Sequence, residues 1–414
     1  MNLLPFLQDS LTPFHATETL ALAFAAAGYR ELAETEAWSL NSGDKVFFRR
    51  GSGALVAWVV GDEPAAGFRL AAAHTDSPGW KLKLAGQTVQ APGLVRIGTE
   101  VYGGPIHATW FDRPLAVAGR IFVRFQGGLA ELLVRTPALG VFPNLAIHYN
   151  REVNKGFAYD LQEHLCLLAG LGAQPDLQSW LAAEYGFAVK DFVSGELFAV
   201  DAEPPSLLGT DGLYLSARVD NLAGCHAVAE ALLSLSKSAR ATRVALFFDH
   251  EEIGSRTQTG ADSVLVADLV ERITLARGGN REDTFRAKAA SFLVSVDAAH
   301  GQHPNWAGMH DKNYAPQLGG GPVLKSSARF SYATNGASEA LVREAASKAG
   351  VTLQNFVMKS SLVPGSTVGP LATAASGIAG ADVGIPLWAM HSVRETAHQR
   401  DQEGMIALLT QLFG

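Results

Sequence analysis

Apolar positions repeat in two different patterns along the chain. From residue 213 onward, apolar runs of strand length alternate with segments of helical periodicity. Helices are predicted over 222–236, near 262–272, over 337–349 and over 401–412. Strands are predicted over Leu213–Val219, Arg243–Phe248, Phe292–Val296 and Leu353–Val357. Such an alternation predicts a largely parallel sheet of the α/β class.

The first 81 residues fit the same pattern. A helix is predicted over 17–33, with Thr17 as its cap and an end near Gly28. Two strand-length apolar runs follow, Ala54–Val60 and Phe68–Ala73. These residues are therefore expected to join the later α/β portion.

The chain between residues 82 and 214 has a different pattern of residues. Short β-branched runs alternate there with Gly and Pro, as in Leu94–Ile97, Leu115–Phe125 and Leu129–Arg135. Helical patterns are seen near 176–186 and 190–200. The chain is thus predicted to form a catalytic domain from 1–81 and 215–414, with a β-rich domain, 82–214, inserted between its two parts.

Five apolar runs of the predicted sheet end in residues that can bind a metal ion. The residues that follow these runs are His74 with Asp76, then Asp220, then Glu251 with Glu252, then Asp297, and finally His391. Ligands of open α/β sheets bind beyond the carboxyl ends of the strands, and parallel strands would bring all five ends to one edge. The sequence therefore predicts a His/Asp/Asp/Glu/His cluster at that edge.

This set of side chains suits a pair of divalent ions, with one carboxylate shared between them. Imidazole and carboxylate ligands without thiolate favour zinc, with manganese or cobalt as alternatives. A remaining carboxylate would act as general base toward a water activated by the metals. Any one of these residues alone is more often a cap or turn residue, but the five together favour a metallohydrolase.

Composition narrows the class of protein further. The 414 residues are 48% hydrophobic and carry a formal net charge of -7, which indicates two or three globular domains and disfavours nucleic acid as a partner. The two cysteines form no CxxC pair, so neither a disulfide framework nor a thiolate metal cluster is expected. No apolar run has the length of a membrane span, and the start lacks a basic signal-peptide region. A cytoplasmic location is predicted.

Ordered motifs along the whole chain resemble the aspartyl aminopeptidase family of co-catalytic dinuclear zinc aminopeptidases. The motifs that carry the resemblance are Thr12–His15, Ala73–Pro78, Tyr102–Gly104, Thr109–Arg113, Leu145–His148, Arg218–Leu222, Asp249–Ser255, Val296–His300, Tyr332–Asn335, Gly365–Thr367 and Ala389–Glu395. The resemblance implies a three-layer α/β/α zinc-peptidase domain with an inserted β-rich dimerisation domain. It also implies a homo-oligomer, a tetrahedral dodecamer built from dimers.

The resemblance implies a role for each residue of the cluster. Asp220 would bridge two metal ions and be followed by a cis peptide bond. His74 and Glu252 would complete one metal site, and Asp297 and His391 the other. Glu251 would be the general base that takes a proton from the bridging water, and Asp76 would orient His74.

Members of the family remove N-terminal Asp or Glu from peptides, so a cation must bind the side-chain carboxylate of that residue. The matching position is Lys325, which without the resemblance would be an ordinary solvated lysine. His148 would reach the active site of a neighbouring subunit, and is otherwise a polar residue on an interfacial strand. Two alternatives stay open. One is a two-metal hydrolase of neutral N-terminal residues or acylated amino acids, and the other is a non-catalytic shell protein with the same fold.

Overall fold

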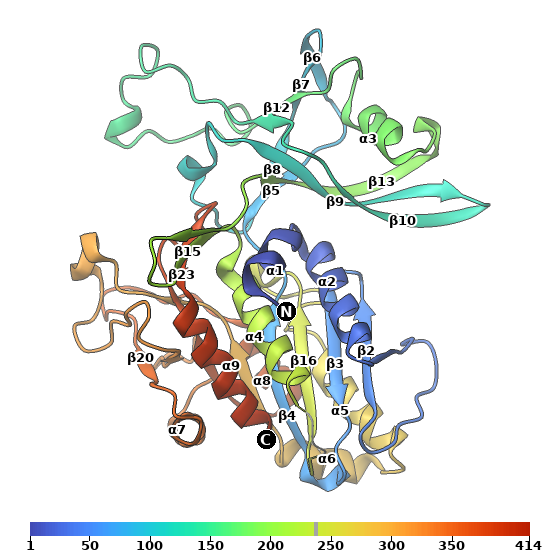
Figure 1. The fold of residues 1–414 in the computed structure, drawn as a ribbon, viewed down its shortest axis with the longest axis vertical. Helices are drawn as coiled ribbons and strands as arrows, with labels where there is room; N and C mark the ends of the chain where they lie inside the picture. The colour runs from blue at the N-terminus through green and yellow to red at the C-terminus, as the bar shows by residue number, and fades with distance from the viewer. Residues whose placement is uncertain (236–238) are drawn as a thin grey trace. The chain divides into compact units, whose positions relative to one another are not determined.

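The structure, a computed structural model, describes residues 1–235 and 239–414 (Figure 1). The chain forms two compact units. The first comprises Met1–Asp76, Pro205–Met390 and Glu395–Gly414, and the second comprises Ser77–Pro204 with the short segment His391–Arg394.

The first unit is built on a nine-stranded sheet with the order β1-β2-β3-β16-β4-β17-β21-β19-β20. Its central strands β16, β4, β17 and β21 are parallel. Strand β3 runs antiparallel to β2 and β16, β19 runs antiparallel to β21, and the edge strands β1 and β20 are parallel to β2 and β19. The strands are β1 (Arg30–Glu31), β2 (Lys45–Arg50), β3 (Ala54–Val59), β4 (Phe68–His74), β16 (Thr242–Phe248), β17 (Phe292–Val296), β19 (Val323–Lys325), β20 (Gln354–Phe356) and β21 (Ala379–Gly384).

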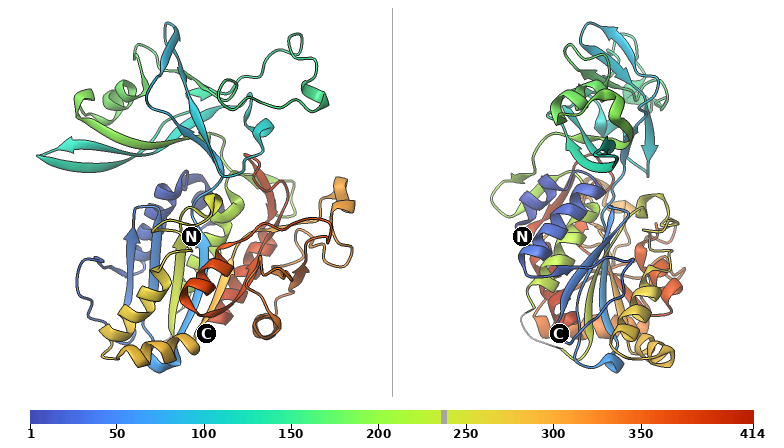
Figure 2. Two further views of the ribbon diagram at one scale, coloured as in Figure 1. Left: turned by 180° about the vertical axis from the view of Figure 1, so that it is seen from behind. Right: turned by 90° about the vertical axis from the view of Figure 1, so that its right-hand side faces the viewer.

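Helices cover both faces of this sheet (Figure 2). They are α1 (Leu3–Asp9), α2 (Pro13–Ala26), α4 (Val219–Leu233), α5 (Leu265–Ala276), α6 (Arg281–Ala289), α7 (Gly336–Ala349), α8 (Val368–Ser376) and α9 (Gln399–Phe413). Two small sheets complete the unit. They contain β14 (Ser206–Leu208), β15 (Leu213–Ser216) and β23 (Glu395–His398), and β18 (Ala299–His300) with β22 (Pro386–Leu387).

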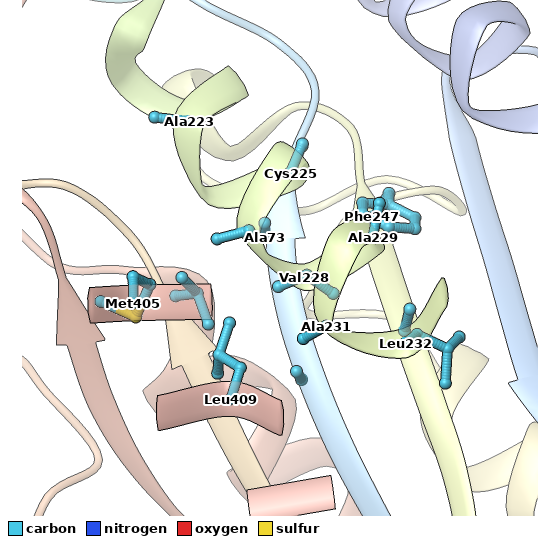
Figure 3. Packing of buried hydrophobic residues seen from close by; sticks show 14 of the residues in the cluster. Ala73, Ala223, Cys225, Val228, Ala229, Ala231, Leu232, Phe247, Met405 and Leu409 are labelled. Atoms are coloured by element: carbon cyan, nitrogen blue, oxygen red, sulfur yellow. The ribbon is translucent and has the colours of Figure 1, made fainter. Parts of the chain in front are cut away.

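Side chains of each central strand alternate between two hydrophobic cores, because successive residues of a strand face opposite sides of the sheet. In β16, Phe247 packs in the core beneath α2, α4, α7 and α9, whereas Leu246 packs in the core beneath α5, α6 and α8. Figure 3 shows the first of these cores, where Val228 of α4 and Leu409 of α9 lie with Ala73 of β4. The predicted three-layer α/β/α arrangement is confirmed.

The second unit is an antiparallel sheet with the order β6-β7-β12-β11-β9-β13-β5-β8, and β10 pairs with β9. One helix, α3 (Leu177–Tyr185), belongs to it. The strands are β5 (Gly79–Leu82), β6 (Thr88–Ala91), β7 (Leu94–Ile97), β8 (Thr99–Tyr102), β9 (Leu115–Phe125), β10 (Gly128–Arg135), β11 (Gly140–Val141), β12 (Leu167–Gly170) and β13 (Phe192–Asp201). Its core contains Trp80, Val117, Leu197 and Val393.

Several predicted elements differ from those observed. The helical pattern over 190–200 is wrong, because this stretch is β13 and pairs with β9 along its length. The first long helix is capped at Thr12 with Pro13 at its first position, so Thr17 lies within α2. The limits of the second unit, Ser77 and Pro204, also differ from the predicted limits 82 and 214. The difference arises because β5 pairs with β8 and β13, while β14 and β15 join β23 of the first unit.

Among the residues that the structure describes, no helix has both the length and the apolar character needed to cross a membrane.

Candidate active site

Three neighbouring parallel strands end in predicted site residues. His74 is the last residue of β4, Glu251 and Glu252 follow β16 after two further residues, and Asp297 follows β17 directly. Because β16 and β17 flank β4 in the sheet, their carboxyl ends lie at the same edge. The strand-end prediction is confirmed for these three runs.

Asp220 reaches the site in a different way. Its predicted strand, Leu213–Val219, is β15 in a separate sheet, and Asp220 itself lies in the first turn of α4. The backbone here is not helical, and the peptide bond between Asp220 and Asn221 is cis. The Asp220 amide donates to Oε2 of Glu395 (2.9 Å), and Asn221 Nδ2 donates to the carbonyl of Val296 (2.8 Å). These two bonds tie the start of α4 to the end of β17 and to β23.

The imidazole of His74 lies between carboxylates on both of its nitrogen atoms. Nδ1 is 3.1 Å from the Asp76 carbonyl and 3.3 Å from Asp76 Oδ1, so Nδ1 carries the proton and donates it. Nε2 lies 3.5 Å from Asp220 Oδ1 and 3.6 Å from Asp297 Oδ1. Burial opposes protonation of the ring, but the hydrogen bonds to Asp220, Asp297 and Asp76 raise the pKa of His74 well above its usual value, and a bound cation would replace the proton on Nε2. All four side chains are buried.

These contacts change the expected pairing of ligands. The potential ligand atoms of His74, Asp220 and Asp297 lie within 4.8 Å of one another, and His74 forms a second such group with Glu251 and Glu252. The short distances from Nε2 favour Asp220 and Asp297 as the partners of His74, in place of the predicted pairing of His74 with Glu252.

Asp76 contacts more of the site than predicted. Beyond its contact with His74, its Oδ1 accepts a hydrogen bond from the Glu251 amide and its Oδ2 one from the Glu252 amide, both at 3.1 Å. These amides open a 3₁₀ turn over Glu251–Ile253. One buried carboxylate therefore fixes the imidazole at the end of β4 and the paired glutamates after β16.

Crowding of the carboxylates changes their pKa values. Burial, followed by the charges of Asp297, Asp76 and Asp220, raises the pKa of Glu251 to about 8, although His74 opposes the shift. Burial and Asp220 also raise the pKa of Glu252 well above its usual range. Burial opposes ionisation of Asp297, yet the Lys325 cation and His74 together lower its pKa to about 2. The cluster thus concentrates negative charge in a buried place.

This donor set fits a divalent cation. It offers one imidazole nitrogen and several carboxylate oxygens within reach of one another, and no thiolate is among them. Zinc accepts nitrogen and oxygen ligands of this kind, and a cation would neutralise carboxylates that otherwise repel one another.

Lys325 is buried beside the cluster, with only 1% of its surface exposed, so it is not a solvated lysine. Nζ donates to the carbonyls of Asp297 (2.9 Å) and Ala298 (3.2 Å) and lies 3.9 Å from Asp297 Oδ2. It also lies 5.1 Å from the centre of the Tyr332 ring. The ammonium is therefore held against the backbone of a predicted metal ligand.

Two predicted residues belong to the second unit. His391 falls in the segment His391–Arg394, and its Nδ1 lies 3.1 Å from the carbonyl of Gly104. Its predicted strand, Pro386–Met390, is reduced to β22 in a two-stranded sheet. His148 is exposed on a loop beside the exposed side chains of Leu145, Ile147 and Tyr149. The roles of His391 and His148 stay predictions.

The structure adds residues to which the sequence assigned no role. Glu395, which accepts a hydrogen bond from the Asp220 amide, is the last residue of the motif Ala389–Glu395. Tyr332, whose ring lies beside Lys325, is the first residue of the motif Tyr332–Asn335. Their presence within these motifs was the available signal. Neither residue type nor spacing indicated that one would bind a backbone amide and the other would face a lysine.

The chain matches one protein family along nearly its whole length. Residues 6–413 match the family described as aminopeptidase I zinc metalloprotease (M18). A probable M18 family aminopeptidase 2 from Clostridium acetobutylicum is 39% identical over 95% of this chain and 93% of its own length. A probable M18 family aminopeptidase 2 from Streptomyces coelicolor is 40% identical over 95% and 92%.

Solved structures share the fold. The structure described as the Ape4 and Nbr1 complex matches with a TM-score of 0.94 and 33% identity, over 99% of this chain and 84% of that chain. The S. cerevisiae mApe1 dodecamer matches with a TM-score of 0.86 and 23% identity, over 99% and 95%.

Proposed function

The chain belongs to the M18 family of zinc aminopeptidases, and from this premise we propose that it releases N-terminal Asp or Glu from peptides with the help of two divalent ions. The observation that carries the proposal is the buried group of His74, Asp220 and Asp297, in which an imidazole nitrogen faces two carboxylates. Zinc is the proposed metal, with cobalt or manganese as substitutes.

We assign His74, Asp220 and Asp297 to one ion, and Asp220, Glu252 and His391 to the other. The distances around His74 Nε2 support the first set. The second set takes the two predicted ligands that remain, Glu252 and His391, and so departs from the predicted pairing of Asp297 with His391. Two bound ions would polarise the scissile carbonyl and lower the pKa of a water between them.

Glu251 is the carboxylate of the paired glutamates that this ligand set leaves for proton transfer. In the proposed reaction it accepts the proton of the attacking water and delivers it to the leaving amine. Asp76 positions Glu251 through the backbone amide. Burial and the neighbouring carboxylates raise the pKa of Glu251, and bound cations would lower it again, so that the carboxylate could accept a proton. Both features suit a general base.

In the proposed function, Lys325 binds the side-chain carboxylate of the substrate. A buried ammonium attracts an anion more strongly than a solvated one, because the local dielectric constant is lower. However, Lys325 already donates to two carbonyls. This observation favours a second candidate, an aminopeptidase for neutral N-terminal residues in which Lys325 only supports Asp297.

A reporter panel separates the two candidates. Rates should be measured on aspartyl, glutamyl, alanyl, leucyl and N-acetylated reporters for wild-type protein, Lys325→Met and the exposed control Lys348→Met, with metal content recorded for each. Acidic preference predicts that Lys325→Met lowers kcat/KM on aspartyl reporters at least tenfold more than on alanyl reporters. Faster cleavage of neutral reporters by wild-type protein would establish the second candidate.

The protein is also proposed to form a homo-oligomer, with a dodecamer as the predicted form. The resemblance to a dodecameric relative and the exposed apolar side chains beside His148 support this. If His148 acts in a neighbouring subunit, mixing His148→Ala with Glu251→Gln subunits should restore part of the activity that each lacks alone. No recovery in verified mixed oligomers would contradict that role. The cytoplasmic location stays a prediction.

A further inference from the structure

The segment His391–Arg394 adopts an unfavourable backbone conformation. It is grouped with the second unit, although the residues before and after it belong to the first. Within the segment the φ angle of His391 is +68°, and Ala389, which precedes the segment, has a φ angle of +58°. Residues with a Cβ atom rarely adopt this left-handed conformation, and it persists only where the surroundings hold it in place.

Backbone contacts within the second unit hold this segment. The His391 carbonyl accepts a hydrogen bond from the Ile106 amide (2.9 Å), and the Val393 amide donates to Thr109 Oγ1 (3.0 Å). The Val393 side chain is buried in the core of the unit. The segment is thus fixed on both sides of Ser392.

A buried charge network fixes the last residue of the segment. Asp201, the final residue of β13, has a fully buried side chain, and the Arg394 side chain is only 8% exposed. Asp201 Oδ2 accepts from Arg394 Nη1 (3.0 Å), and Oδ1 accepts from Arg113 Nε (3.1 Å). Arg394 Nη2 also donates to the Pro204 carbonyl (2.8 Å). Because Asp201 is buried between two guanidinium groups, removing its charge would leave them only the half-exposed carboxylate of Glu203.

The same arrangement sets the orientation of the His391 ring. Nδ1 lies 3.1 Å from the Gly104 carbonyl, which can only accept, so Nδ1 carries the proton. In this tautomer Nε2 is the ring nitrogen that could coordinate a metal. A backbone carbonyl that binds one imidazole nitrogen is a common way to prepare the other for a metal.

We propose that Asp201 is a positioning residue for the metal ligand His391. Through Arg394 it holds the segment His391–Arg394 in place, keeps His391 in its left-handed conformation and so presents Nε2 to an ion. The inference rests on the proposed function, in which His391 is a ligand. It assigns a part in metal binding to a carboxylate that belongs to the β-rich unit and is itself no ligand.

The test is metal affinity. Full-length wild-type protein, Asp201→Asn, His391→Ala and Glu203→Gln are freed of metal and titrated with Zn²⁺ against a chromophoric chelator. Glu203 is the matched control, because it contacts the same two arginines but is half exposed. His391→Ala is expected to lose one of the two ions. Asp201→Asn is expected to lower the affinity for that same ion by about 10- to 100-fold. Excess Zn²⁺ should restore the kcat of Asp201→Asn. Glu203→Gln should bind Zn²⁺ with the affinity of wild-type protein.

Each outcome decides the proposal. Wild-type Zn²⁺ affinity for both ions in folded Asp201→Asn would overturn it. If Asp201→Asn does not fold, Thr109→Val, which removes the acceptor for the Val393 amide, should weaken the same ion by a smaller factor, and unchanged affinity there overturns the proposal as well. If His391→Ala binds both ions as wild type does, the proposed ligand set itself fails. If His391→Ala loses an ion but Asp201→Asn does not, the proposed ligand set stands and the positioning role of Asp201 is overturned.

Discussion

The sheet edge of the first unit and the segment His391–Arg394 of the second position candidate ligands in different ways. His74 and Asp297 are placed by adjacent parallel strands, whose backbone hydrogen bonds fix where each strand ends. His391 lies on a short stretch with a positive φ, held by side chains such as Thr109 and Asp201. A ligand on a strand end depends on the sheet as a whole, whereas a ligand on such a segment depends on a few specific contacts.

Metal removal should have the largest effect and should involve both regions. Dialysis against a chelator is expected to abolish hydrolysis of aminoacyl reporters, because the carboxylates and imidazoles would lose the ions that activate water. Zinc, cobalt or manganese should restore hydrolysis, which reporter assays can follow. Full activity in protein verified as metal-free would contradict the proposed chemistry.

Glu251→Gln tests the sheet edge without removing a proposed ligand. Turnover should fall by roughly 10²- to 10⁴-fold, since an amide cannot accept the proton of the attacking water. Metal content should stay at the wild-type level, in contrast to Glu252→Gln, which should lose metal. Steady-state rates together with metal analysis check this, and unchanged turnover would exclude Glu251 as the base.

Asp76→Asn is the counterpart, within the first unit, of the Asp201 variant. Asp76 accepts from the amides of Glu251 and Glu252 and contacts His74, and an Asn side chain can satisfy only part of these donors. Metal affinity should fall about 10- to 100-fold. Zinc titration of the metal-free variant measures the change. An affinity equal to that of wild type would show that the strands position His74 without help from Asp76.

Acidification should give the smallest effect, through a buried histidine in the core of the first unit. His226 Nε2 donates to the Met1 carbonyl (3.0 Å), Nδ1 accepts from Gln402 Nε2 (3.0 Å), and burial lowers the pKa of His226 below its usual 6.5. The folded protein therefore binds this proton less readily than the unfolded chain does. The stability that neutral His226 contributes is present above pH 6.5 and is lost as the pH falls below it.

Urea unfolding of metal-free protein at pH 7.5 and pH 5 measures this difference. Wild-type protein should lose more stability on acidification than His226→Gln, which has no group to titrate there. Among the described residues of the second unit no histidine is buried, so the effect belongs to the first unit. Equal losses in the two proteins would contradict the assignment.

Sequence patterns predicted the parts of the site that depend on the sheet. The apolar runs before His74 and Asp297 are long enough to be strands, and their ends lie where parallel strands must end. The same logic misplaced Asp220 and His391, because the runs before them form short strands in other sheets. The strand-end pattern thus nominated these two residues for a reason that the structure does not bear out, and the family resemblance named them independently. The stretch 190–200 was misread because its alternation emerges only when Leu197 and Ala199 pack into the core of the second unit.

Some contacts could not be predicted because they join distant residues through single hydrogen bonds. The bond from the Asp220 amide to Glu395 spans 175 positions, and the bonds from Asp76 to the paired glutamates span about as many. Neither periodicity nor residue type carries information about such partners. The burial of Lys325 is a similar case, since its charge suggested solvent while its neighbours are carbonyls from the end of β17.

The split composition of the second unit has a consequence for protein engineering. Replacing Ser77–Pro204 with a short linker would remove most of that unit but leave His391–Arg394 in the truncated chain. Val393 would then lose its apolar pocket, and Arg394 would lose Asp201, Glu203 and the carbonyl of Pro204. A minimal version of the first unit therefore requires a redesign of these four residues as well as the deletion.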